Sequence, residues 1–191
     1  ISLGLVGSEM CIRDSTMLDY SDDGLWLLER DAVVPPPGLI VHHRANCVQM
    51  VAHRLDMRAS DIAFDDLTDA DAPQMFALAR LCEPGPFFEH TNRMGRFIGV
   101  RHEGRLIAMA GERLQPEGYT EVSGVCTHPH HRGRGYAAAL MRIVAARILA
   151  RDEVPFLHSY ASNAGAIALY EALGFRNRAS IMLTVLTRAT G

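Results

Sequence analysis

The stretch THPHHRGRGYAA, residues 127–138, decides the fold that this sequence predicts. Before it, the apolar pattern of residues 120–126 is typical of a strand. After it, residues 135–150 carry apolar side chains at the i, i+3, i+4, i+7 spacing of an amphipathic helix. The stretch is therefore expected to connect a strand to a helix.

The turn inside this stretch has the composition of a phosphate site. Gly133 and Gly135 permit backbone conformations that other residues avoid, and a glycine-rich turn entering a helix directs consecutive N–H groups toward one point. The helix dipole adds about half a positive elementary charge at that point. Arg132 and Arg134 stand beside it in the sequence, so a pyrophosphate is the natural ligand.

Two other phosphate-binding motifs compete for the same turn. A nucleoside triphosphate P-loop requires a Lys and then a Ser or Thr after its last glycine, and neither is present. A dinucleotide fingerprint can be matched to Gly133, Gly135 and Ala138, with Asp152 as the acid that binds the ribose. That fold places its first glycine directly after a strand, whereas six residues intervene here, and the preceding strands suggest antiparallel neighbours.

Segments of strand and helix character continue outward from the turn. Strands are expected at residues 62–64, 96–100, 106–114, 120–126 and 155–161, near 175 and at 181–186, and helices at 69–81, 135–150 and 164–173. The turn from His102 to Arg105 indicates a hairpin. This order predicts an α/β fold with a mixed, mostly antiparallel sheet flanked by helices.

A second motif, NAGAIALYEALGF at residues 163–175, coincides with the last expected helix. Asn163 and Tyr170 are seven residues apart, which places them on one helix face, and Gly174 ends the helix as glycine commonly does. Together with the [QR]-x-x-G-x-[GA] pattern of residues 132–137, it resembles the GCN5-related N-acetyltransferase (GNAT) superfamily, and in particular its FR47-like branch. The resemblance covers roughly residues 60–190.

The resemblance implies a GNAT-like twisted sheet and direct transfer of an acetyl group from acetyl-CoA to a primary amine of a small molecule, peptide or protein. It implies that Asn163 contacts the pantetheine arm and that Tyr170 lies near the thioester sulfur. The purely structural alternative is that Asn163 starts a helix and Tyr170 is an aromatic core residue. The expected cofactor-binding residues are Val125, Cys126, Thr127, Arg132, Gly133, Arg134, Gly135, Tyr136, Ala137 and Asn163. A catalytically silent CoA-binding module is the alternative function.

Acetyl transfer to a charged amine also requires a base. Freeing a lysine-like amine of its proton at pH 7 costs about 4.6 kcal/mol, and an α-amino group about 1 kcal/mol. By the resemblance, Glu121 has the position of the general base in histone-type members, eleven residues ahead of Arg132. Glu112 on the neighbouring strand is the second candidate, and a water chain is the third.

Composition and charge limit the remaining functions. With 19 basic and 22 acidic residues the net charge is −3, which gives no field for nucleic acid or an anionic membrane. His128, His130 and His131 lack the helical spacing of a metal site, and we expect no metal. The four cysteines form no C-x-x-C pair, which favours a reducing cytosol. A monomer or a homodimer is expected.

The first 59 residues are expected to stand apart from the acetyltransferase domain at residues 60–191. Residues 1–15 have no secretory pattern and resemble translated sequencing-adapter DNA, so they are interpreted as a non-native or disordered leader. Residues 16–59 read as an N-terminal extension of a few strands or a short helix, interrupted by three prolines at 35–37. Their role is open, and so is the identity of the acceptor amine.

Overall fold

The structure is a computed structural model that describes residues 24–56 and 62–189, so the expected leader at residues 1–15 lies outside the described residues. The chain divides into two compact units. Of the described residues, the core unit contains 50–56, 62–157 and 165–176, and the strand unit contains 24–49, 158–164 and 177–189.

The sheet has eight strands in the order β1-β8-β2-β7-β6-β5-β4-β3. Neighbours β3–β4, β4–β5, β5–β6 and β1–β8 are antiparallel, and β6–β7 is parallel. The expectation of a mixed, mostly antiparallel sheet flanked by helices is therefore confirmed. β6, α3 and β7 form a parallel β-α-β unit, but the antiparallel neighbours β4 and β5 on the other side of β6 differ from the parallel sheet of a dinucleotide-binding fold.

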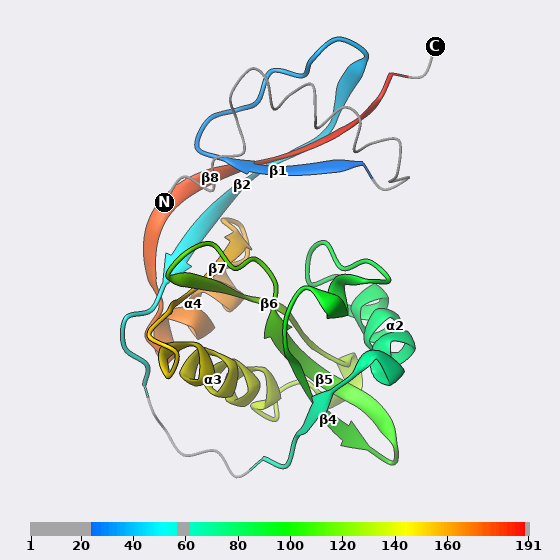
Figure 1. The fold of residues 1–191 in the computed structure, drawn as a ribbon, viewed down its shortest axis with the longest axis vertical. Helices are drawn as coiled ribbons and strands as arrows, with labels where there is room; N and C mark the ends of the chain where they lie inside the picture. The colour runs from blue at the N-terminus through cyan, green and yellow to red at the C-terminus, as the bar shows by residue number, and fades with distance from the viewer. Residues whose placement is uncertain (1–23, 57–61, 190–191) are drawn as a thin grey trace. The chain divides into compact units, whose positions relative to one another are not determined.

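The core unit is built around three adjacent strands, β4 (Phe97–His102), β5 (Arg105–Glu112) and β6 (Tyr119–Thr127). The expected hairpin joins the first two through Glu103 and Gly104, which have φ of 49° and 74°. Helices α2 (Ala72–Cys82) and α3 (Tyr136–Leu149) lie on opposite sides of these strands (Figure 1). Met75, Leu78 and Ala79 of α2 pack against Phe97, Leu106, Met109 and Cys126 to form the core on their side.

Two further elements, β7 (Val154–Tyr160) and α4 (Ala164–Leu173), follow α3 in the chain. The helix has the bounds that the sequence predicts, because its apolar residues repeat at helical spacing up to the glycine that ends it. Gly174 has φ +106°, and a Cβ there would lie 2.4 Å from the Arg54 carbonyl oxygen, so only glycine fits at this helix end.

Two strand predictions were wrong. The strand expected at residues 62–64 lies at β3 (Asp65–Leu67) instead, where Arg101 and Arg147 pair with its two aspartates at the sheet edge. The two short strands expected near residue 175 and at 181–186 are one strand, β8 (Arg176–Arg188). Residues 176–180 are mostly polar and mostly exposed, and they continue the strand without a break.

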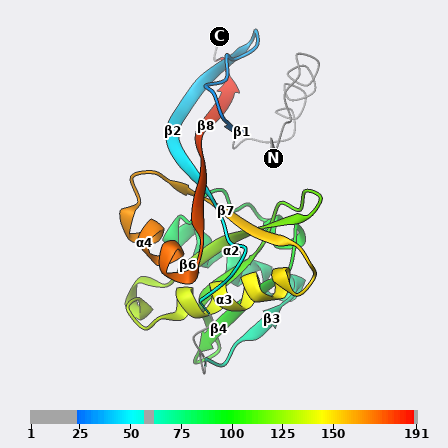
Figure 2. The ribbon, with the colours of Figure 1, turned by 90° about the vertical axis from the view of Figure 1, so that its left-hand side faces the viewer.

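In the strand unit, the long strands β2 (Leu39–Val51) and β8 lie side by side, and β1 (Leu25–Glu29) pairs with β8 (Figure 2). Leu25 and Leu27 of β1 pack with Leu39 and Leu186, whereas Trp26 and Leu28 pack with Cys47, Leu183 and Val185. Alternate β1 residues thus contact two separate apolar clusters, as the pleat of a strand requires.

Candidate active site

The predicted phosphate turn lies at the start of α3 in the core unit. Gly133 and Gly135 have φ of +77° and +78°, and a Cβ at either would meet nothing within 4 Å. The backbone therefore demands glycine, while the space above it is open. This open cradle fits a group that approaches the backbone closely.

The first turn of α3 leaves its N–H groups available to that space. Gly135 is the N-cap and supplies no side-chain hydrogen bond, and the first helical bond runs from the Ala139 N–H to the Gly135 carbonyl at 3.0 Å. The N–H groups of Tyr136, Ala137 and Ala138 thus project from the helix end without intrahelical acceptors. Such a helix end fits an anion such as a pyrophosphate.

The strand before the turn separates from its parallel neighbour. β6 pairs with β7 only from Tyr119 to Glu121, so its residues 122–127 have no partner in β7. The expected cofactor residues Val125, Cys126 and Thr127 fall in this part of the strand. Thr127 ends it with a buried Oγ1 that has no hydrogen-bond partner among the described residues. An extended ligand with amide groups fits an open strand edge of this kind.

A bulge interrupts the same strand. Gly111 opposes Ser123 and Met109 opposes Cys126, so β6 has one residue more than β5 in this interval. Gly124 has φ +62°, and a Cβ there would lie 2.8 Å from the Phe97 ring. A bulge leaves its extra residue outside the ladder and turns the strand, which exposes backbone groups beside the open edge.

Tyr170 is half-buried on α4, and its ring makes an edge contact with Phe175 at 6.5 Å between centroids. Burial raises the pKa of its hydroxyl above the usual value. The hydroxyl therefore stays protonated at neutral pH, as a proton donor must be. Asn163 is the residue directly before α4 and belongs to the strand unit, so its contact with the cofactor stays a prediction.

Both candidate bases are buried and bound to arginines. Glu121 accepts hydrogen bonds from Arg113 Nε and Nη2, both at 2.9 Å, and its side chain is 2% exposed. Glu112 accepts two bonds from Arg151 at 3.1 Å, and its side chain is 4% exposed. Bidentate pairing fixes the orientation of each carboxylate.

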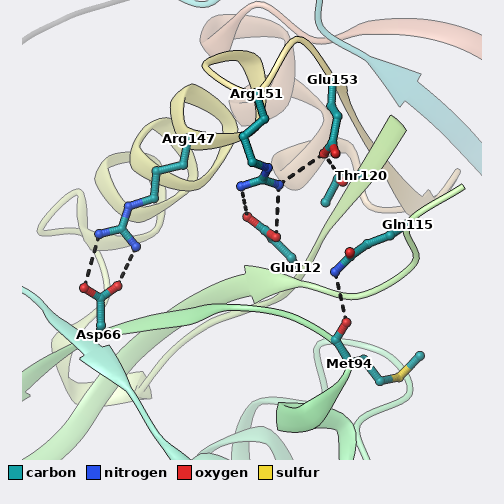
Figure 3. Close-up of polar contacts among 8 residues, drawn as sticks. All are labelled: Asp66, Met94, Glu112, Gln115, Thr120, Arg147, Arg151 and Glu153. Carbon is teal, nitrogen blue, oxygen red and sulfur yellow. Dashed lines mark hydrogen bonds and ion pairs between the residues drawn. The ribbon is translucent and has the colours of Figure 1, made fainter. Parts of the chain in front are cut away.

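The two pairs lie on opposite faces of the sheet. Arg113 also donates to the Pro86 carbonyl at 3.2 Å, in the loop that follows α2, so Glu121 faces the α2 side. Arg151 follows α3, and it bonds Glu153 as well as Glu112 (Figure 3). Glu112 therefore fixes the end of α3 to β5, whereas Glu121 lies on the opposite face of the sheet.

Both arginines were missed by the sequence analysis. Arg113 follows Glu112 directly, and alternation along a strand places neighbours on opposite faces. An arginine near a candidate carboxylate on an adjacent strand was the one available signal that Arg113 is bound to a glutamate. Its partner could not be fixed, because that requires the register of β5 against β6.

The histidines before the turn contact one another. The rings of His128, His130, His131 and His102 lie 5.2 to 5.7 Å apart between the paired centroids. His128 Nδ1 accepts the His130 N–H at 3.3 Å. Burial and then the neighbouring Arg134 lower the pKa of His131. Within the described ranges, no group of three His, Cys, Asp or Glu residues has the arrangement of a metal site.

In the same described part of the chain, none of the helices combines the length and apolar character that spanning a membrane requires.

One open pocket of about 540 Å³ lies at the C-terminal end of α4, lined by Val51, His53, Arg54, Leu55, Asp56, Glu171, Ala172, Gly174 and Arg176. It contains none of the predicted site residues.

Comparisons with known proteins agree with the fold of the chain. The family described as FR47-like protein matches residues 97–183. A crystal structure described as a GNAT-family acetyltransferase from Novosphingobium aromaticivorans is 48% identical, with a TM-score of 0.84, over 92% of this chain and 80% of that one. No curated protein sequence gave a match.

More distant structures share the fold. An acetyltransferase from Colwellia psychrerythraea is 14% identical, with a TM-score of 0.62, over 77% of this chain and 58% of that one. The ribosomal-protein-S18-alanine N-acetyltransferase from Escherichia coli is 21% identical, with a TM-score of 0.54, over 68% and 96%. The identity to the Novosphingobium protein and the family match show that the chain belongs to the GCN5-related N-acetyltransferase superfamily of acyltransferases, in its FR47-like branch.

Proposed function

We propose that this protein transfers an acetyl group from acetyl-CoA directly to a primary amine of a small molecule, peptide or protein. One observation carries the proposal: the glycine turn opens into a helix end without a side-chain cap, and the strand that precedes this turn has an open edge. A pyrophosphate and an extended amide-containing arm are the two parts of CoA that suit these two features.

Binding would use mainly backbone groups. The N–H groups of residues 133–137 would take the pyrophosphate, with Arg132 and Arg134 adding positive charge. The free edge of β6 at Val125, Cys126 and Thr127 would bind the arm by strand-like hydrogen bonds, and Asn163 would add a side-chain amide. The Thr127 hydroxyl, buried without a partner among the described residues, would gain one.

Catalysis would need the protein to position an amine, remove its proton and protonate the leaving thiolate. Acetyl-CoA supplies an already activated thioester. Tyr170, whose raised pKa keeps its phenol protonated, is proposed as the acid. Glu121 is proposed as the base, acting through water because Arg113 occupies its carboxylate oxygens.

The acceptor side would be formed by the loops at residues 84–92 and 115–119. Arg113 connects the first loop to Glu121 through the Pro86 carbonyl. The Gln115 side chain donates to the Met94 carbonyl at 3.1 Å, close to where the first loop ends (Figure 3). The first bond ties loop 84–92 to the Arg113–Glu121 pair, and the second ties residue 115 to the segment that follows that loop.

The test is consumption of acetyl-CoA, followed as release of free thiol, with lysine-like amines, α-amino peptides and polyamines as acceptors. At least one amine class should accelerate thiol release well above the rate without acceptor, with the acetylated amine seen by mass spectrometry. Tight binding of acetyl-CoA with no turnover on any amine would instead support the silent CoA-binding module.

A further inference from the structure

Cys82 and Cys126 come from different elements and pack in one cluster next to Thr127, which precedes the phosphate turn. Cys82 is the last residue of α2, and Cys126 lies on β6. Cys82 packs against the apolar cluster that contains Cys126. Cys126 is 5% exposed, whereas Cys82 is half-buried. Reagents in solution can therefore reach the Cys82 thiol directly, but not the Cys126 thiol.

The surroundings of Cys82 connect it to the turn. Its Sγ donates, in the thiol form, to the Thr127 carbonyl at 3.3 Å, and Arg132 Nε donates to the same carbonyl at 3.3 Å. A hydrogen bond from Cys126, then hydrogen bonding and charge from Arg132, lower the pKa of Cys82 to about 6. The same pairing with Cys82, together with burial, raises the pKa of Cys126.

A half-exposed thiol beside an arginine and a second, buried thiol is the arrangement of a reactive pair. We propose that Cys82 is a thiol modification site that reacts with small-molecule disulfides, with Cys126 as the resolving cysteine. This proposal goes beyond acetyl transfer and does not depend on it.

The reaction consumes one small disulfide. The Cys82 thiolate attacks one sulfur of the disulfide, which breaks the S–S bond, forms a mixed disulfide and releases one thiol. Cys126 then loses its proton to solvent and attacks the Cys82 sulfur, which releases the second thiol. Two protein thiols are oxidised to one disulfide, and the small disulfide is reduced to two thiols.

The second step becomes feasible because of the first. While Cys82 is a thiolate, its negative charge and hydrogen bond keep the proton on Cys126. Once Cys82 is in a mixed disulfide, that charge is gone, burial is the remaining influence that raises the pKa of Cys126, and its proton is lost more readily. The change also removes the anionic partner of Arg132, so the modification alters the charge of the phosphate turn.

Alkylation rates test the nucleophile. The native protein is treated with iodoacetamide from pH 5 to 9, and peptide mass spectrometry follows each cysteine separately. The rate at Cys82 should level off above pH 7, whereas the same peptide in urea-unfolded protein should gain about tenfold per unit up to pH 8. Arg132→Gln should move the plateau to higher pH. A native Cys82 rate that rises as in urea would overturn the proposal.

Oxidised glutathione tests the resolving step. The wild type should lose two hydrogens and show a Cys82–Cys126 peptide, whereas Cys126→Ala should accumulate a glutathione adduct at Cys82. Cys82→Ser should form neither product. Cys47 is the internal control, because burial raises its pKa and its apolar cluster contains no second cysteine among the described residues. A stable adduct at Cys82 in the wild type would rule out Cys126 as its partner.

Discussion

At the scale of single residues, Tyr170 separates an enzyme from a silent binding module. Tyr170→Phe retains the ring and its contact with Phe175 while it deletes the hydroxyl. Turnover should fall about 10²- to 10⁴-fold, the usual effect of losing a positioned acid, with little change in CoA affinity or stability. Free thiol release under saturating acetyl-CoA measures this. An unchanged rate on every active acceptor would make Tyr170 a packing residue.

Glu121→Gln tests the base. The variant should slow a lysine-like acceptor more than an α-amino acceptor, because deprotonation costs about 3.6 kcal/mol more for the lysine-like amine. Glu112→Gln is the matched control, since both glutamates are buried and held by a bidentate arginine, but on opposite faces. A larger and acceptor-dependent loss in Glu112→Gln would transfer the role to Glu112.

The residues predicted from sequence are those whose roles depend on local spacing. Short motifs placed Gly133 and Gly135 in a turn and Tyr170 on a helix, and the structure has them there, while their roles stay predictions. Arg113, Arg151 and Cys82 could not be predicted, because their partners are chosen by strand register and helix packing. Cys82, for example, bonds a carbonyl 45 residues along the chain.

At the scale of elements, Gly135→Ala tests the joint between the turn and α3. A Cβ at φ +78° costs about 1–2 kcal/mol, and it would extend into the space proposed for the pyrophosphate. We expect CoA affinity to fall at least about tenfold, or 1.4 kcal/mol. Isothermal titration calorimetry measures the affinity of the folded variant.

Gly104→Ala is the control for backbone strain. Gly104 has φ +74° in the β4–β5 hairpin, and a Cβ there would also meet nothing within 4 Å. The Gly104→Ala variant should lose about as much stability as Gly135→Ala, while its affinity for CoA stays near the wild-type value. Equal affinity losses in the two variants would assign the effect to strain and remove the phosphate role.

The end of α3 gives a prediction of stability. Arg151→Met should lower the free energy of unfolding by about 3–5 kcal/mol, because it leaves the Glu112 carboxylate buried without its partner (Figure 3). Urea denaturation measures the loss. Adding Glu112→Met should recover most of it, since two apolar side chains replace the pair. If the double variant is no more stable than Arg151→Met, the loss of stability comes from lost side-chain packing and not from an unpaired Glu112 carboxylate.

Element prediction succeeded where periodicity was continuous. The α4 helix and the β4–β5 hairpin follow from apolar spacing and a two-residue turn. The strands β3 and β8 were misplaced because polar residues fill them: Asp65 and Asp66 are bonded to arginines from other elements, and residues 176–180 are mostly exposed. Charge pairing across the fold is not visible in a hydrophobic pattern.

At the scale of the whole molecule, the strand unit joins segments from both ends of the described chain. β1 pairs with β8 in antiparallel register from Leu25–Leu186 to Glu29–Met182. The apolar runs predict strands there, but no turn signal connects them, since almost the whole chain lies between. The sequence could therefore indicate the strands and not their neighbours.

A ligand that binds only the folded protein tests the proposed site in the intact chain. At 100 times its dissociation constant, acetyl-CoA should add about 2.7 kcal/mol to stability. For a chain of this size, that corresponds to an increase in Tm of roughly 5–11 °C, measured by scanning fluorimetry.

NAD and ATP at equal concentration are the controls that separate binding of a phosphate from binding of the extended arm of CoA. All three ligands contain an adenine nucleotide with a pyrophosphate, so a turn that recognised phosphate alone would respond to each. Only acetyl-CoA has an arm that can pair with the open edge of β6, where residues 122–127 have no partner in β7. We therefore expect acetyl-CoA to raise Tm clearly more than the other two. A larger increase with NAD would contradict the proposed role of the β6 edge, because NAD ends in a nicotinamide ring and lacks the extended chain with two secondary amides that would pair with a strand.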